Sequence, residues 1–466
     1  MYGIQSNVVR QFNRTKSSLE EEGGLTFRSA VPDGDIESFL SHCPPDSRDR
    51  IYPPDVTLFA FLAQVSKPDG SCQDAVARIR ADRAVRGLKP CSTKTSSYVR
   101  ARQRLPLTGL KSLAKTKARE LDNALPSEWL WKGRRIKIID GSTFAAADTP
   151  ENQAMFPQHT NQKPGVGFPL IRLAIMTSLA SGAAIDCRIG PFSGKGCGEL
   201  PLAVKLLENL EVSDILVADR YYLTYFFISL VAAKGADFVT RHFDSRQFNV
   251  ITRQRINKRG EIIVLKKPRI PHTGWLDQKT YDEIPKTLTV RKSQIKIIRA
   301  GYRDEWLTII TTLTDAKLYT QENLADIYLW RWQVELDLRV IKRLMGLNFV
   351  AAKTPEMVAK EVWIRLLAYN IIRSIIAMAA HQSSKLPRQI SFKGCLGLII
   401  AYHTAWKEED FDHRCIMFED MLSAIAGIKA AHRPNRQEPR AIKRRPGCNL
   451  PLLKKPRKSM GDIQGP

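Results

Sequence analysis

The amino-acid sequence predicts an α/β protein in which strands and helices alternate in a central block between two helical regions. Two patterns favour this class. Apolar residues recur at helical spacing between about residues 55 and 105, and again after residue 321. Between 134 and 240, short β-branched runs alternate with helical segments, which is typical of a sheet whose strands are joined through helices.

The composition limits the function classes. The chain has 466 residues, enough for several structural units with their own hydrophobic cores. It carries 72 Lys and Arg against 47 Asp and Glu, a formal net charge of +25. A surplus of this size indicates a polyanionic partner, nucleic acid before an anionic membrane face. A basic protein that adheres to polyanions without a defined site fits the same charge.

The sequence pattern favours a cytoplasmic protein. The first residues are polar and lack the apolar segment of a secretory signal. The most apolar long stretch, 363–380, includes Arg365, Asn370 and Arg373, which favours a buried or amphipathic helix over a membrane span. The eight cysteines form no C-x-x-C pair, so we expect reduced thiols rather than a zinc site.

The first region, 1–125, is predicted to be a helical DNA-binding domain. Three helices are expected in it, over 55–65, over 72–86, and from a cap at Ser92 or Thr93 to residue 105. The third helix carries Arg100, Arg102 and Arg104, which we take as candidate DNA-binding residues. A reader of the helix-turn-helix kind fits this basic unit, and so does a solvated basic helix pair without groove specificity.

The central block begins at residue 126. Its expected order is strands at 134–139, 168–179 and 183–189, a helix at 199–210, a strand at 214–218, a helix at 225–234 and a strand at 237–240. Three strands followed by helix, strand, helix and strand is the plan of a ribonuclease-H-like core. We therefore assign 126–241 to the first part of such a core.

A β-rich insertion is predicted to interrupt the core at 242–312, because basic, strand-like segments fill this block. A long helix at 321–345 follows, so 313–390 is assigned to the second part of the core. The remainder, 391–466, is expected to be a helical region with a basic tail. That tail is either an extended segment along phosphates or a solvated one.

Two aspartates stand at comparable places in the core. Asp140 ends one apolar run and Asp219 ends another. If the two strands are neighbours in one sheet, both carboxylates emerge at the same edge, where ligands bind in α/β folds. Carboxylates held close together repel one another unless a cation lies between them, and Mg²⁺ prefers oxygen ligands. An aspartate that simply starts a turn or caps a helix is the competing interpretation of each position.

The long helix carries a third candidate acid. Tyr328, Arg331, Glu335 and Lys342 are spaced by 3, 4 and 7 residues, which keeps them on one face of an ideal helix. A purely structural interpretation makes Arg331 and Glu335 a surface ion pair with Lys342 solvated. It leaves unexplained why all four polar residues share one face.

The spacing Tyr-x2-Arg-x3-Glu-x6-Lys, together with Asp140-Gly-Ser-Thr and Asp219-Arg-Tyr-Tyr, resembles the insertion-sequence-four family of DDE transposases over roughly residues 50–445. The resemblance implies cut-and-paste transposition, with metal-dependent DNA cleavage and strand transfer. Asp140, Asp219 and Glu335 would be the catalytic residues and would bind two Mg²⁺ ions, with Mn²⁺ as a substitute. The implied partners are double-stranded DNA, as terminal inverted repeats and target, and a second copy in a synaptic homodimer. The implied location is the bacterial cytoplasm, at the nucleoid.

The family implies further DNA-binding residues. Tyr328, Arg331 and Lys342 would grip phosphates near the transposon end. Some relatives cut through a DNA hairpin and stack a flipped base on a tryptophan, and Trp306 lies on the corresponding strand. A buried core tryptophan is the alternative for Trp306, and Trp275 is a weaker candidate. Two other functions stay open: a transposase relic that only binds DNA, and a metal nuclease without strand transfer.

Overall fold

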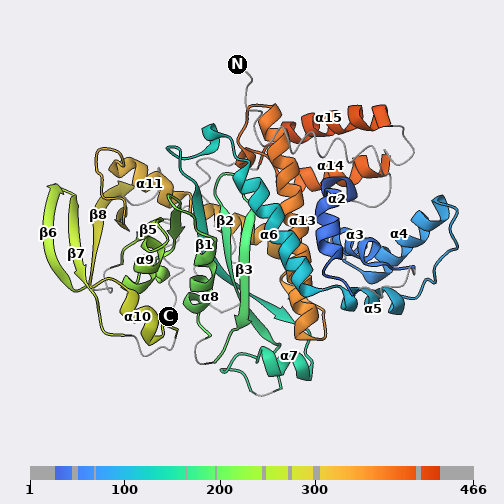
Figure 1. Cartoon of the computed structure of the whole chain (residues 1–466), viewed down its shortest axis with the longest axis horizontal. Coiled ribbons are helices and arrows are strands. Elements are labelled where there is room, and N and C mark those ends of the chain that lie inside the picture. The colour runs from blue at the N-terminus through green and yellow to red at the C-terminus, as the bar shows by residue number, and fades with distance from the viewer. Residues whose placement is uncertain are drawn as a thin grey trace, which may run out of the picture. The chain divides into compact units, whose positions relative to one another are not determined.

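The computed structural model describes residues 27–44, 51–67, 70–163, 165–194, 197–243, 248–270, 275–297, 305–405 and 411–430. The fold is mixed α/β, with one large sheet and helices packed on it (Figure 1). The chain separates into two compact units, Met1–Ile295 with Leu307–Ala430, and Lys296–Trp306 with Ala431–Pro466. The sheet core, the helices around it and the candidate site belong to the first unit.

Helices fill the N-terminal region. After the 3-10 turn η1 (Arg28–Ala30) they are α2 (Asp33–Leu40), α3 (Pro54–Val65), α4 (Cys72–Val85), α5 (Ser96–Arg104) and α6 (Leu107–Asn123). The helices expected over 55–65 and 72–86 are confirmed as α3 and α4. The third helix, α5, begins later than predicted. The residue before its first turn is Thr95, not Ser92 or Thr93. The short α2 was not predicted, since only Ile36 and Phe39 of it are buried.

The first five strands of the sheet are β1 (Ile136–Ala146), β2 (Leu170–Ser178), β3 (Ala184–Pro191), β4 (Ile215–Ala218) and β5 (Asp237–Arg241). They lie side by side in the order β3-β2-β1-β4-β5. β1, β2 and β3 are antiparallel, and Gly182, with φ 78°, makes the turn between β2 and β3. β4 and β5 run parallel to β1. All five strands were predicted, but β1 continues well beyond its expected end at residue 139.

Helices cross over between these strands. α8 (Glu199–Leu206) and the 3-10 turn η3 (Leu207–Asn209) join β3 to β4, and α9 (Tyr225–Ala232) joins β4 to β5. α8 packs on β2 and β3. Shorter elements are η2 (Ser127–Trp129), α7 (Pro150–Met155) and η4 (Arg220–Tyr222). The predicted alternation of strands and helices in this block is confirmed.

The block after β5 continues the same sheet. It contains β6 (Val250–Asn257), β7 (Gly260–Lys266), α10 (Gln278–Glu283), β8 (Thr287–Ile297) and β9 (Glu305–Thr311). β9 pairs antiparallel with β5, with Val239 opposite Thr311, and the order onward is β9-β8-β7-β6. Figure 1 shows β8, β7 and β6. Apolar side chains such as Ile263 and Val290 join the hydrophobic core of the first five strands. The block and the first strands therefore share one sheet and one core.

The helix expected over 321–345 is not continuous. It divides into α11 (Gln321–Leu329), α12 (Trp332–Arg339) and the π-helical turn η5 (Val340–Leu344). Between α11 and α12 the backbone tightens, because the amides of Arg331, Gln333 and Val334 bond three residues back. In η5 the backbone widens, and Met345 N donates to Val340 O at 3.0 Å. The strand β10 (Phe349–Val350) then pairs with the end of β1.

The last described region is helical. It comprises α13 (Pro355–Gln382), the 3-10 turn η6 (Pro387–Gln389), α14 (Phe392–Ala405) and α15 (Phe411–Gly427). α13 is long and apolar enough to cross a membrane, but 89% of its most apolar window is buried inside the protein. It packs against α3, α6, α14 and α15 (Figure 1). Asn370, fully buried in it, donates to Ala114 O and Ala184 O, so the stretch 363–380 is the buried helix that we expected.

Candidate active site

The two strand aspartates lie at neighbouring positions of the sheet. Ile139 of β1 is opposite Ala218 of β4, so Asp140 and Asp219 are the next residue on each chain. β4 ends there, and Asp219 caps η4 by accepting a hydrogen bond from Tyr221 N at 2.8 Å. Asp140 instead lies inside β1, which continues because β2 still pairs with it. The predicted adjacency of the two strands is confirmed.

Helix α12 and the turn η5 bring the third acid to β1. Arg331 Nη1 lies 3.6 Å from Asp140 Oδ2, and Arg331 Nη2 lies 2.7 Å from Glu335 Oε1. Lys342 Nζ donates to Ser142 Oγ at 3.1 Å. The guanidinium of Arg331 therefore bridges a strand carboxylate and a helix carboxylate. The i,i+4 ion pair of the structural interpretation exists, but it faces β1 and not open solvent.

Tyr328, on α11, is the remaining residue of the helix motif. Burial raises the pKa of its phenol and the Asp219 carboxylate adds to this, while Arg331 and Arg241 act in the opposite direction. Burial also lowers the pKa of Lys342, with Arg343 adding to it. Arg331 and Lys342 thus contact β1, and Glu335 pairs with Arg331. Tyr328 lies near Asp219 and Arg241.

Asp140 is an unusual carboxyl group. Burial, helped by the carboxylates of Glu199 and Asp219, raises its pKa to about 7, although the Gly141 amide at 2.8 Å and the Arg331 guanidinium oppose this. A pKa so high means that the negative charge is poorly compensated by the protein alone. A cation bound at Asp140 would supply the missing compensation.

Glu199, the first residue of α8, was not predicted as a site residue. Its carboxyl group occupies the space that a Cβ on residue 141 would fill, so a side chain at residue 141 would have to displace it. The Tyr222 hydroxyl donates to Glu199 Oε1, and Arg172 Nη1 lies 3.9 Å from Oε2. The glycine that follows Asp140 in the sequence was the available signal.

The donors at this site are carboxylate oxygens, which suits a hard divalent cation. Among the residues that the structure describes, no three His, Cys, Asp or Glu side chains gather closely enough to hold a metal ion. Glu335 is turned to Arg331 and not to the aspartates. The carboxylate donors and the raised pKa of Asp140 fit a divalent metal ion. In this structure Arg331 pairs with two of the acids, Asp140 and Glu335.

The N-terminal arginines differ from one another. Arg100 and Arg104 are exposed on α5. Arg102 is only 7% exposed and lies over the rings of Phe61 and Tyr98, at 4.8 and 5.4 Å from their centres. Its guanidinium also donates to Gln64 Oε1 at 3.3 Å. These contacts give Arg102 a packing role, which the sequence did not indicate.

The two tryptophan candidates also differ. Trp306 in β9 is 47% exposed, so the alternative of a buried core residue does not describe it. Trp275 packs edge-on against Phe226, with ring centres 6.4 Å apart, and joins the core. Trp275 is therefore explained by packing.

Asp337 is fully buried on α12 and faces away from Asp140. Its Oδ1 accepts hydrogen bonds from Arg373 at 2.7 Å, Arg388 at 2.6 Å and the Tyr369 hydroxyl at 3.0 Å. These partners lie on α13 and η6. The carboxylate thereby ties the helix of Glu335 to the central helix of the protein.

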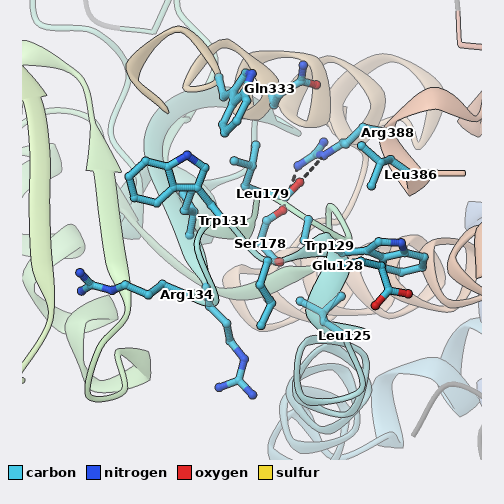
Figure 2. Close-up of a pocket in the computed structure, with 15 residues that line it drawn as sticks. Leu125, Glu128, Trp129, Trp131, Arg134, Ser178, Leu179, Gln333, Leu386 and Arg388 are labelled. Carbon is cyan, nitrogen blue, oxygen red and sulfur yellow. Dashed lines mark hydrogen bonds between the residues drawn. The ribbon is translucent and has the colours of Figure 1, made fainter. Parts of the chain in front are cut away.

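A pocket of about 310 Å³ lies near the start of β1 (Figure 2). Tryptophans 129, 131 and 330 contribute to its lining, and Arg388 lies beside it with its guanidinium bonded to the carbonyls of Ser178 and Leu179. Trp330 and Gln333 come from the same turn as Arg331. The pocket wall and the site therefore share one short piece of backbone.

Comparison with known proteins identifies the class. Residues 131–371 match the transposase DDE domain. This match spans more than half of the chain, so the protein belongs to the DDE transposases.

The relatives narrow the group. The chain is 26% identical over 359 residues to transposase InsG for insertion sequence element IS4 of Escherichia coli K12, covering 75% of this chain and 77% of the relative. Together with the domain match, this similarity supports an insertion-sequence transposase of the IS4 type. Over 68 residues it is 37% identical to the transposase for insertion sequence element IS421 of Escherichia coli, covering 15% of this chain and 18% of that protein.

A solved structure of the piggyBac transposase synaptic complex with hairpin DNA matches 91% of this chain and 83% of its own, with a TM-score of 0.35 and 10% identity. At this level of similarity no residue correspondence follows.

Proposed function

We propose that this transposase binds the ends of its insertion sequence and catalyses metal-dependent DNA cleavage and strand transfer, with Asp140, Asp219 and Glu335 as the catalytic residues. The observation that carries the proposal is the bridge made by Arg331 between Asp140 and Glu335, with Asp219 at the adjoining strand end. This bridge, with Asp219 at the neighbouring strand end, supports a site built from carboxylates of three separate elements.

Two divalent ions, Mg²⁺ or Mn²⁺, would be held by Asp140, Asp219 and Glu335. They would make a water nucleophilic and stabilise the leaving oxygen. The raised pKa of Asp140 supports this assignment, because a cation relieves the uncompensated charge there. For Glu335 to reach a metal, its side chain has to leave Arg331.

The side chains around the acids would position DNA. Once released from the carboxylates, Arg331 can bind a phosphate with two parallel hydrogen bonds. Lys342 adds a positive charge beside Ser142, and Tyr328 adds a hydroxyl donor. These three residues would hold the phosphate in line with the attacking oxygen.

The reaction would consist of two in-line phosphoryl transfers. In the first, water attacks the phosphorus at the transposon end, the bond from phosphorus to the 3′-oxygen breaks, and that oxygen leaves as a hydroxyl. In the second, this hydroxyl attacks a target phosphorus, loses its proton, and displaces the 3′-oxygen of the target strand. No covalent enzyme intermediate is needed.

The architecture proposed for this activity is a ribonuclease-H-like core at 126–241 and 313–390, supported by the strand order β3-β2-β1-β4-β5 with α8 and α9 between strands. The strands of 242–312 would be its insertion, and 391–466 its helical C-terminal region. The helices of 1–125 would bind DNA, with Arg100 and Arg104 at phosphates and Trp306 stacking on an unpaired base. We propose a cytoplasmic, nucleoid-associated homodimer that bridges two DNA ends.

The test is a joining reaction with labelled insertion-sequence ends, a target plasmid and Mg²⁺. We expect Asp140→Ala, Asp219→Ala and Glu335→Ala each to lower strand transfer at least about 1,000-fold, as expected for loss of a residue that stabilises the transition state by several kcal/mol. Asp282→Ala, an exposed acid on α10, is the control and should join ends like the wild type.

Three outcomes would contradict the proposal. Joining by the three variants at the wild-type rate would exclude the triad. Cleavage without joining by the wild type would make the protein a nuclease, and binding without cleavage would make it a DNA-binding relic.

A further inference from the structure

We infer that Glu199 is a fourth carboxylate of the metal site, reaching it from the face of β1 opposite to Glu335. This inference rests on the proposed function, because it extends the metal site of Asp140, Asp219 and Glu335. The carboxylates of Asp140, Asp219, Glu335 and Glu199 would together hold the divalent cations, for which oxygen ligands are suited.

Side chains alternate between the two faces of β1, and this places Glu335 and Glu199 on opposite faces of the strand. Side chains of successive strand residues point to opposite faces. Asp140 and Ser142 contact Arg331 and Lys342 on the α12 side. Gly141, between them, contacts Glu199 on the α8 side. A second acid therefore approaches the same three-residue segment from behind, and it can do so because residue 141 has no side chain.

Glu199 is also tied to the turn that carries Asp219. Asp219 caps η4, and Tyr222, the last residue of that turn, donates its hydroxyl to Glu199 Oε1. Tyr222 is fully buried, so its ring holds the hydroxyl in place. One short turn thus fixes the position of Asp219 and the orientation of Glu199.

The charges argue for a ligand and not for a structural contact. The side chain of Glu199 is about one-fifth exposed, and Arg172 at 3.9 Å is a distant partner. A glutamine would serve as well to accept the Tyr222 hydrogen bond. A third carboxylate beside Asp140 and Asp219 costs free energy through repulsion unless a cation lies among them. The arrangement is favourable only when that cation is bound.

The decisive variant is Glu199→Gln in the full-length protein, with Mn²⁺ as the probe. We expect Mn²⁺ affinity, measured by titration calorimetry, to fall at least about tenfold, the loss typical of altered metal sites. The metal-free variant should melt at a higher temperature than the wild type, because one repelling charge is gone. The rise in melting temperature on adding Mn²⁺ should shrink.

Gly141→Ala tests the same inference while keeping Glu199. Its methyl group would displace the Glu199 carboxyl group, which is the movable end of a long side chain. We expect the same loss of Mn²⁺ affinity in a folded protein. Glu211→Gln is the matched control: it also removes one glutamate charge, but from an exposed pair with Arg135 before β4. It should bind Mn²⁺ like the wild type.

The outcomes distinguish failure of Glu199 as a ligand from failure of the metal site itself. Wild-type Mn²⁺ affinity in Glu199→Gln and in Gly141→Ala would overturn the fourth ligand, provided that Asp140→Ala and Asp219→Ala lose binding. If these two aspartate variants also keep wild-type affinity, the proposed metal site itself is wrong. A lower melting temperature of metal-free Glu199→Gln with unchanged Mn²⁺ affinity would make Glu199 a structural residue and overturn the inference.

Discussion

At the scale of single residues, the site is defined by charge that the protein does not balance. Asp140 has carboxylates as neighbours on two sides, Glu199 and Asp219, and one distant cation, Arg331. Proteins rarely keep such a cluster without using it, since perturbed carboxyl groups concentrate at functional sites. The consequence for stability can be measured.

Metal-free protein should lose stability as the pH rises toward and through 7. The pKa of Asp140 lies near 3.8 in the unfolded chain and is raised to about 7 in the fold, so the folded state binds the proton more tightly over this interval. The contribution of the Asp140 proton to the free energy of unfolding is full at acidic pH and is lost as the carboxyl group ionises.

The measurement compares wild type with Asp140→Asn, whose amide does not ionise. In chelator, the free energy of unfolding of the variant should exceed that of the wild type by a few kcal/mol at pH 8 and by much less at pH 5. A difference that does not change with pH would contradict this assignment. Added Mn²⁺ should stabilise only the wild type.

Residue types and spacing indicated the three acids and the helix motif, because Asp140, Asp219 and Glu335 lie at places that strand and helix periodicity define. They did not indicate Glu199, whose role depends on a contact with a glycine distant in sequence. They also did not separate Arg102 from Arg100 and Arg104. Whether an arginine is buried depends on the neighbouring helix, here on Phe61 of α3.

At the scale of elements, the segment that carries Glu335 departs from the regular helix that its sequence periodicity predicts. An ideal helix was expected over 321–345, but the backbone tightens at Arg331 and widens into a π-helical turn at Lys342. Such local changes arise from tertiary contacts and have no clear sequence signature. The strands were better predicted, since burial on both faces gives continuous apolar runs, yet the length of β1 depended on its partner β2.

Asp337 should hold α12 to the central helix. Replacing it by Ala would leave Arg373 and Arg388 without their shared carboxylate in a buried place, which we expect to cost about 3–5 kcal/mol. Urea denaturation gives the free energy of unfolding directly. Asp326→Ala, an exposed acid on α11, should change it by less than about 0.5 kcal/mol. Equal stability of both variants would refute the role of Asp337.

At the scale of the whole molecule, the net charge of +25 agrees with a DNA partner for a transposase. Charge alone does not locate the contacts, because many arginines are used internally. Arg102 on α5 and Arg373 on α13 are buried in this way. Arg100 and Arg104 of α5 are exposed and remain available to phosphates.

The double variant Arg100→Ala, Arg104→Ala should bind insertion-sequence ends more weakly. Each lost phosphate contact should reduce the slope of log affinity against log salt by about one. Arg102→Ala is the matched control from the same helix: it should lower the melting temperature and leave the salt slope unchanged, because its contacts are internal. Fluorescence anisotropy at several salt concentrations gives the slopes. Identical slopes in the double variant and the wild type would exclude α5 from the DNA interface.

The pairing of β9 with β5 bears on any attempt to reduce this transposase to a smaller catalytic unit. β5 borders β4, the strand that leads to Asp219, and its other edge is covered only by the strand that closes the 242–312 block. Excising that block would uncover a backbone edge in the middle of the sheet, together with core side chains such as Phe226 that now meet Trp275. A shortened enzyme would need a designed cap on β5 before its chemistry could be tested, because an uncovered strand edge promotes aggregation.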